Sequence, residues 1–181
     1  IDIIGNSKFV IIETIEQLKR EKLITNSGYS IYDPEEIIKL NNIYKSDIFQ
    51  LPYNIFDRRF EKVIDQKNTS LKNTEIHIRS IFLKGLLLQP SLQEINHYFS
   101  KWTPSFLKWK GWLYDNNIDP LQACLNLIKK NNQIDSIIVG VDSLIQLRSI
   151  YDAYINDSYI YPDNCFINDI NLLDPRKWNF K

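Results

Sequence analysis

The sequence predicts an α/β fold built on a parallel sheet. Four short apolar runs, at residues 23–32, 47–54, 75–82 and 135–142, alternate with segments of helical periodicity. Strands that alternate with helices form parallel sheets, because each helix carries the chain back to the start of the next strand. Polar side chains also gather just after the runs, which is where α/β proteins build their sites.

The first two runs are each accompanied by a helical pattern. A helix is expected over residues 9–21, because four apolar side chains fall on one stripe, namely Ile11, Ile12, Ile15 and Leu18. The run 23–32 is followed by Asp33-Pro34, which is typical of a helix start, so a short helix is expected over 34–42. The second run, 47–54, contains Pro52, where the apolar pattern breaks.

The third and fourth runs have different patterns. The third, "EIHIRSIF", alternates, so that His77 and Arg79 share one face while Ser80 lies on the other with Ile76 and Ile78. The fourth, "DSIIVGVD", has the unbroken Ile-Ile-Val stretch typical of a strand buried on both faces. Helical patterns at 120–130 and 143–154 precede and follow it.

Two stretches carry weaker patterns. Residues 89–117 hold three of the four tryptophans, and we interpret them as a helical crossover with a loop. Residues 155–181 are expected to form a mostly irregular C-terminal tail. Since no internal repeat or linker divides the chain, residues 1–181 are interpreted as a single domain. The chain contains no Met and starts at Ile1, so we expect the domain to be incomplete at its N-terminus.

The composition excludes several classes of partner. The 181 residues are 44% hydrophobic and carry 22 basic and 22 acidic side chains, so no net charge would attract nucleic acid or a membrane surface. No apolar stretch reaches the roughly 18 residues that span a bilayer. Cys124 and Cys165 have no CxxC spacing, which favours reduced thiols in a cytoplasmic protein. Four parallel strands leave two unpaired sheet edges, so a homo-oligomer is also expected.

Four stretches of the chain carry a specific resemblance. "GYSIYDPEEI", "IFQLPYNIFDRRF", "IHIRSIFLKGLLL" and "SIIVGVDSLIQL" resemble the second half of the aldo-keto reductases, most of all bacterial members related to aryl-alcohol dehydrogenases. The resemblance runs from about residue 5 to residue 154. It implies the C-terminal half, about strands five to eight, of a (β/α)8 barrel that binds NADP or NAD without a Gly-rich Rossmann fingerprint.

The resemblance implies which residues hold the nicotinamide end of the cofactor. Ser30 and Gln50 match the residues that bond the carboxamide, whereas Ile31 stands where the family has Asn. Arg79 occupies the position of an aromatic side chain that stacks on the nicotinamide, and a guanidinium can also lie flat against a ring. The family's proton-donating Tyr and its partners lie on strands one to four, so no catalytic residue is assigned in this chain.

The resemblance also implies the contacts to the rest of the cofactor. Ser80, Phe82 and Gly85 match positions along the pyrophosphate. The family has a Gly-x-Arg/Lys-Ser pattern on the eighth strand, whose cation binds the 2′-phosphate of NADP. Its counterparts here are Gly140, Asp142 and Ser143, so a carboxylate replaces the cation. Gln146 matches an adenosine contact, while Ile150 replaces the usual Asn one turn later.

The leading hypothesis is therefore the cofactor-binding half of an NAD(P)H-dependent oxidoreductase. The parent enzyme would reduce a small-molecule carbonyl to an alcohol, and this chain alone would be inactive. The alternative is a non-catalytic cofactor-sensing or partner-binding protein on the same fold, which the departures at Ile31, Arg79, Asp142 and Ile150 favour. A phosphate-binding synthase on a similar barrel is less well supported, since no Gly-rich loop follows the last two strands.

The candidate site residues can also be interpreted as purely structural. Gln50 and Asn54 could cap backbone groups at a strand end. Arg58 and Arg59 stand beside Asp57 and Glu61. This favours a surface ion-pair network, which would fix the loop, rather than an anion site. The tryptophans could pack the crossover against the barrel or form a substrate wall. The remaining candidates are expected to be structural or inert, namely His77, His97, Cys124 and Cys165.

Overall fold

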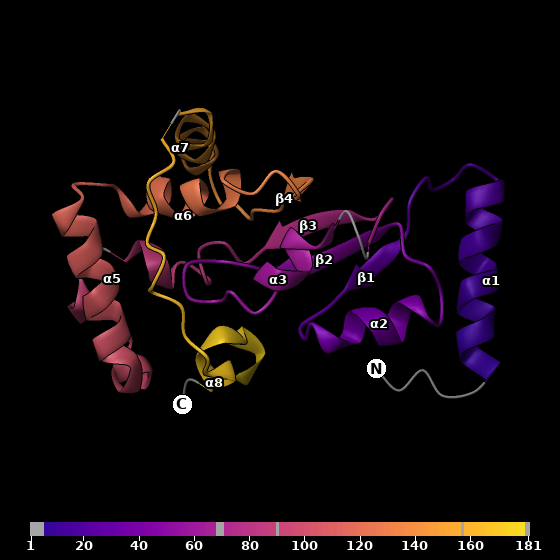
Figure 1. The fold of residues 1–181 in the computed structure, drawn as a ribbon, viewed down its shortest axis with the longest axis horizontal. Helices are drawn as coiled ribbons and strands as arrows, with labels where there is room; N and C mark the ends of the chain where they lie inside the picture. Colours follow the sequence, from indigo (N-terminus) through magenta and orange to yellow (C-terminus); the bar gives the residue numbers. More distant parts are fainter. Residues whose placement is uncertain (1–5, 68–70, 90, 157, 180–181) are drawn as a thin grey trace.

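The four runs form one parallel sheet with the strands in sequence order. The computed structural model describes residues 6–67, 71–89, 91–156 and 158–179. Its strands are β1 (Gly28–Ser30), β2 (Ile48–Pro52), β3 (Glu75–Arg79) and β4 (Ser136–Ile137), and all three pairings are parallel. All strands run from the end of the molecule occupied by α1 toward α5 at the other end (Figure 1). The predicted parallel α/β fold is confirmed.

Helices surround this sheet and connect its strands. Their bounds are α1 (Asn6–Arg20), α2 (Glu35–Asn41), α3 (Glu61–Asp65), α5 (Thr103–Asp115), α6 (Pro120–Lys129), α7 (Leu144–Ile155) and α8 (Ile170–Leu173). Short 3-10 helices are η1 (Leu86–Leu88), η2 (Leu92–Glu94), η3 (His97–Trp102) and η4 (Pro175–Lys177). α6 shows the local logic most clearly, because Asp119 caps its first N–H groups and Pro120 occupies its first turn.

The centre of the sheet forms the core. Four apolar side chains of β2 and β3 are fully buried, namely Phe49, Leu51, Ile76 and Ile78. Gly28 lets β1 approach β2 closely, since a Cβ there would lie 2.1 Å from the carbonyl oxygen of Ile48. The core continues beyond the strand ends into the aromatic side chains of the crossover, where Trp109 is fully buried.

The two sheet edges differ from the sequence prediction. The run 135–142 forms a strand only at Ser136–Ile137, and Ile138 and Val141 are exposed, so the expectation of a strand buried on both faces is wrong. Within the described chain β4 pairs with β3 alone, so it forms an edge of the sheet, and the residues that follow it leave the sheet after two positions. The run 23–32 likewise shortens to Gly28–Ser30. Both edges are therefore short rather than long.

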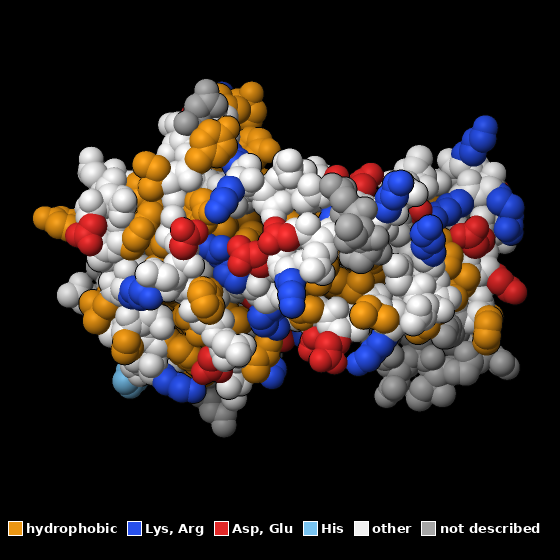
Figure 2. All heavy atoms as spheres, in the orientation of Figure 1, with side chains coloured by type: hydrophobic (Ala, Val, Ile, Leu, Met, Phe, Trp, Pro, Cys, Tyr) orange, Lys and Arg blue, Asp and Glu red, His pale blue; other side chains and the backbone are white. Residues whose placement is uncertain are grey.

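The main exposed apolar surface lies on α7. None of the residues of this helix is buried. Figure 2 shows hydrophobic side chains gathered at the top of the view, over α7. The large exposed side chains there are Leu144, Ile145, Leu147, Tyr151, Tyr154 and Ile155. None of the described helices is long and apolar enough to cross a membrane.

Candidate functional site

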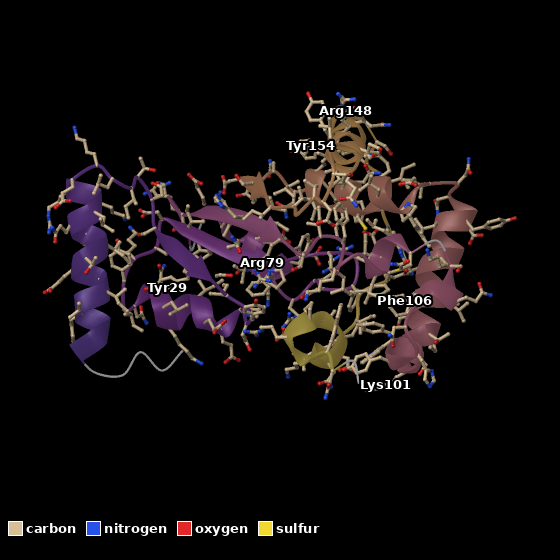
Figure 3. The ribbon with its side chains drawn as sticks, turned by 180° about the vertical axis from the view of Figure 1, so that it is seen from behind. Tyr29, Arg79, Lys101, Phe106, Arg148 and Tyr154 are labelled. Atoms are coloured by element: carbon tan, nitrogen blue, oxygen red, sulfur yellow. The ribbon has the colours of Figure 1, made fainter. Side chains whose placement is uncertain are left out.

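The ends of the first three strands bring together the residues expected at the nicotinamide end. Ser30 pairs with Gln50 in the sheet register, and its hydroxyl donates to Gln50 Oε1 at 3.4 Å. Arg79 is the last residue of β3, and its Nη1 lies 3.4 Å from the Oγ of Ser80. Figure 3 places Arg79 over the middle of the molecule, where the strands end. The strand ends and the segment after β3 are thus directly linked.

The turn after β3 has an unusual backbone. Ser80, Leu83 and Lys84 adopt positive φ angles of 60°, 47° and 51°, and Gly85 follows at 84°. A left-handed conformation is costly for residues with a Cβ, so neighbouring groups must hold it in place. One of them is Asn54, whose Nδ2 donates to the carbonyl oxygen of Ser80 at 3.0 Å. This turn forms one wall of a cavity.

The cavity has a volume of about 560 Å³ and lies between the turn after β3 and the start of α7. Six of the ten residues expected to bind cofactor line it, namely Ser80, Phe82, Gly85, Gly140, Asp142 and Gln146. Its remaining walls are mostly apolar and include Leu121, Ile138, Val139 and Ile150. The volume lies within the range of small-molecule sites.

Two polar side chains of this region cap α7. The Oγ of Ser143 accepts from the backbone N–H of Gln146 at 3.2 Å, and the Oε1 of Gln146 accepts from the N–H of Asp142 at 2.8 Å. The first bond satisfies a backbone donor that the first turn of a helix leaves unpaired, and the second ties the residue before the N-cap to that turn. The charged groups on the cavity wall are Lys84 and Asp142, and neither side chain pairs with another described residue.

The polar cluster after β2 is structural, but it is not on the surface as predicted. Asp57 is fully buried and receives two bonds from Arg59, at 2.8 and 2.7 Å. Arg58 donates to Glu61 at 2.7 Å, and only 9% of its side chain is exposed. The loop folds inward because Asn54 turns the chain, accepting from two N–H groups of that loop. Asn54 therefore caps backbone groups, as its structural alternative proposed.

The tryptophans pack inside the crossover. The indole of Trp109 is buried, stacks on Trp112 with 5.9 Å between ring centroids, and donates to the carbonyl of Leu87 at 3.1 Å. Trp102 donates to Asp169 at 3.1 Å. These contacts agree with the packing interpretation, because both indole N–H groups have partners within the fold.

The histidines and cysteines have ordinary surroundings. His77 Nε2 lies 2.8 Å from a carboxylate oxygen of Glu75, and no histidine reaches the cavity. Burial raises the pKa of both thiols, at Cys124 and Cys165, so neither is a reactive thiolate. Within the described residues, no three His, Cys, Asp or Glu side chains gather in a way that could hold a metal ion.

The sequence prediction missed residues from two segments. Tyr32 follows β1, and Arg176 and Asp174 come from the tail, which contains α8 and η4. The guanidiniums of Arg79 and Arg176 lie 4.1 and 3.2 Å from the centroid of the Tyr32 ring. The sequence signal that could have indicated the tail segment is Asp-Pro-Arg at 174–176, which is typical of a helix start. That signal gives no indication that the segment returns to the strand ends.

Comparison with known proteins adds a result on the fold. No protein-family model and no curated protein matches the chain. Among solved structures, the aldo-keto reductase AKR11C1 from Bacillus halodurans, in its holo form, matches with a TM-score of 0.65 and 16% identity. That alignment covers 85% of this chain and 57% of the other. The chain has part of the aldo-keto reductase fold.

A second solved structure supports the same assignment. An aldo-keto reductase from Pseudomonas aeruginosa matches with a TM-score of 0.54 and 18% identity, over 84% of this chain and 45% of that one. The chain thus spans about half the length of the structures that it matches. The resemblance to aldo-keto reductases is confirmed at the level of the fold.

Proposed function

We propose that this chain is the C-terminal half of an aldo-keto reductase barrel and holds a nicotinamide dinucleotide for a carbonyl-reducing parent enzyme. One observation carries the proposal. Six residues expected to contact the cofactor come from separate segments and still line one cavity. Their gathering at one cavity is what a cofactor site on this part of the barrel requires.

The residues present fit such a cofactor. The apolar walls of the cavity, including Phe82 and Ile138, suit the flat face of a base. α7 begins at Leu144 beside the cavity, and the N-terminus of a helix of this length favours phosphate. At the other end, the amide nitrogen of Gln50 donates to no described residue, which leaves it free to bond a carboxamide oxygen.

The bound cofactor would supply a hydride to the carbonyl carbon of the substrate. The side chains of this chain bind and orient the cofactor, and none of them matches the family's proton donor. We therefore expect no oxidation of NADH or NADPH when the 181-residue chain is mixed with aldehydes. Turnover that a substitution in this chain abolishes would contradict this division of roles.

Asp142 should determine which cofactor is preferred. Its carboxylate lines the cavity without a cationic partner among the described residues. A carboxylate within about 5 Å of a 2′-phosphate costs on the order of 1–3 kcal/mol, or roughly 5- to 150-fold in affinity. A free ribose hydroxyl can instead donate to it. The parent should therefore be less selective for NADPH than its relatives.

Fluorescence titration of the parent enzyme with NADH and NADPH tests whether the nucleotides bind and which of them is preferred. Asp142→Arg should raise the NADPH-to-NADH affinity ratio by about 10- to 100-fold, because it replaces a repulsion with an attraction. Asp152→Arg makes the same charge change on the exposed surface of α7 and should leave the ratio unchanged. An unchanged ratio in Asp142→Arg contradicts the assignment of Asp142, and absence of nucleotide binding contradicts the proposed function.

A cofactor-sensing protein on the same fold is the second candidate. Ile31, at the position where the family has Asn, is only 1% exposed and belongs to the apolar core. One contact to the carboxamide is therefore replaced by an apolar side chain. Binding of NADH without turnover in the full-length parent would favour this candidate over the reductase.

Two further expectations follow from the same structure. Both cysteines are free and buried, which suits a reducing cytoplasmic compartment. The exposed apolar side chains of α7 support self-association of the chain. Sedimentation at roughly tens of micromolar, a concentration at which association-prone chains associate, tests this self-association. A well-folded monomer under those conditions would contradict it.

A further inference from the structure

Two guanidiniums share the ring of Tyr32 at the ends of the strands. Arg79 reaches it from β3 and Arg176 reaches it from η4, with Cζ atoms 4.1 and 3.2 Å from the ring centroid. Each contact is a cation–π attraction. Two like charges beside one ring also repel each other, and an anion placed next to them would relieve that repulsion.

The two guanidiniums differ in how their charge is compensated. Arg176 donates to the carboxylate of Asp174 through Nε at 2.9 Å and through Nη2 at 2.7 Å. Arg79 has only neutral acceptors among the described residues, namely the carbonyl of Ile31 at 2.9 Å and the hydroxyl of Ser80 at 3.4 Å. The Nε of Arg79 is buried and has no hydrogen-bond partner among the residues that the structure describes.

A partly buried cation without a hydrogen-bonded carboxylate is costly. Burial lowers the pKa of Arg79 and the nearby charge of Arg176 also lowers it, and the more distant carboxylates of Asp174 and Asp57 offset this only in part. Other guanidiniums of this region avoid that cost by pairing with carboxylates, as Arg59 does with Asp57. A ligand that brings an anion to Arg79 would gain a charge-assisted hydrogen bond in a partly desolvated place.

The position of Arg79 suits substrate rather than the cofactor ring. One face of its guanidinium already lies on Tyr32, so the edges of the group carry its remaining donors. Arg79 also stands at the ends of the strands, beside Ser80 on the cavity wall. Ligands of barrels and open parallel sheets bind at these ends of the strands.

We propose that Arg79, assisted by Arg176, binds the carboxylate of the ligand, so that the parent enzyme acts on carbonyl compounds that carry a carboxylate. The planar donors of a guanidinium match the two oxygens of a carboxylate. A monoanion is favoured because only Arg79, of the two guanidiniums at Tyr32, has no carboxylate hydrogen-bonded to it among the described residues, whereas a phosphate dianion would need both guanidiniums free. The term substrate rests on the proposed function, but the anion site itself does not.

The test compares pyruvate with methyl pyruvate, which has the same carbonyl and no charge. Calorimetric titration of the 181-residue chain at low salt should give a pyruvate Kd on the order of 1 mM and at least tenfold weaker binding of the ester. Arg79→Gln should weaken pyruvate binding by about 10- to 100-fold, and Arg79→Lys should weaken it less because the charge remains. Equal affinity for pyruvate and its ester overturns the proposal.

Two control variants keep the test decisive. Arg20→Gln removes an exposed guanidinium at the end of α1, on the opposite side of the sheet from the strand ends, and should not change pyruvate affinity. If Arg79→Gln fails to fold, Arg176→Gln serves as the second variant, since the Arg176 side chain is 58% exposed and its replacement should not prevent folding. Arg176→Gln should weaken pyruvate binding severalfold. An equal loss in Arg20→Gln, or displacement of pyruvate by lower concentrations of inorganic phosphate, overturns the carboxylate assignment.

An NADH titration of the same samples separates this inference from the proposed function. NADH binding without pyruvate binding overturns the carboxylate site and leaves the nucleotide site standing. Pyruvate binding that depends on Arg79, without NADH binding, supports the carboxylate site and contradicts the proposed function.

Discussion

Replacing Asn54 with alanine should destabilise the protein more than any other change to a neutral polar side chain near the site. Asn54 is 1% exposed, and its Oδ1 accepts from the N–H groups of Phe56 at 3.0 Å and Asp57 at 2.9 Å. Its Nδ2 donates to the carbonyl of Ser80 at 3.0 Å. One side chain therefore joins the ends of β2 and β3.

The magnitude follows from the groups that alanine would leave unpaired. Two N–H groups and one carbonyl would lose their partner inside the protein, at about 1–3 kcal/mol each. Because a shifted loop can recover part of this, we expect a loss of about 3–6 kcal/mol in the free energy of unfolding. That is a large share of the roughly 5–15 kcal/mol that stabilises a domain.

Urea unfolding followed by circular dichroism measures this loss. With a slope of about 2 kcal/mol/M, the midpoint should fall by about 1.5–3 M in Asn54→Ala. Asn168→Ala is the matched control, since Asn168 is exposed and bonds to no described residue, and its midpoint should stay within about 0.3 M, equivalent to roughly 0.5 kcal/mol. A midpoint for Asn54→Ala within that same range would refute the assignment of Asn54 as the link between the two strands.

Three further changes test the fold. Gly28→Ala should prevent β1 from pairing and reduce the soluble yield. The control Gly111→Ala lies in a helix with open space at its Cβ and should raise stability by about 0.5–1 kcal/mol. Equal soluble yield and stability of the two variants would contradict the close approach at Gly28. A hydrogen bond from Lys101 lowers the pKa of Asp169 from 3.8 to about 2, so its stabilisation is complete above pH 3.8 and is lost as the pH falls toward 2. Asp169→Asn should therefore lose less stability than the wild type over that interval in urea titrations. Cys124 should resist thiol reagents at about pH 8 until the protein unfolds, because burial raises the pKa of its thiol; rapid native labelling would contradict this.

The sequence by itself determined the parallel direction of the strands and the presence of helices that connect them. These follow from local patterns, since apolar periodicity and start signals such as Asp33-Pro34 act over a few residues. The positions expected to bind a cofactor were also readable, because the four quoted stretches carry them. Their assembly into a cavity agrees with that prediction, while their binding of cofactor stays a prediction.

Only the tertiary structure decided how the edges, the ion pairs and the tail are arranged. The Ile-Ile-Val run predicts a doubly buried strand, yet burial depends on what packs over its faces, and here the strand ends at Ile137 and Ile138 is exposed. Asp57 and Arg59 are two residues apart in the sequence, but only the inward turn of the loop buries their ion pair. The meeting of Arg79 with Arg176 joins residues far apart in the chain, so no local pattern could predict it. Contacts of this kind depend on the packed fold, and they set the charge at the site.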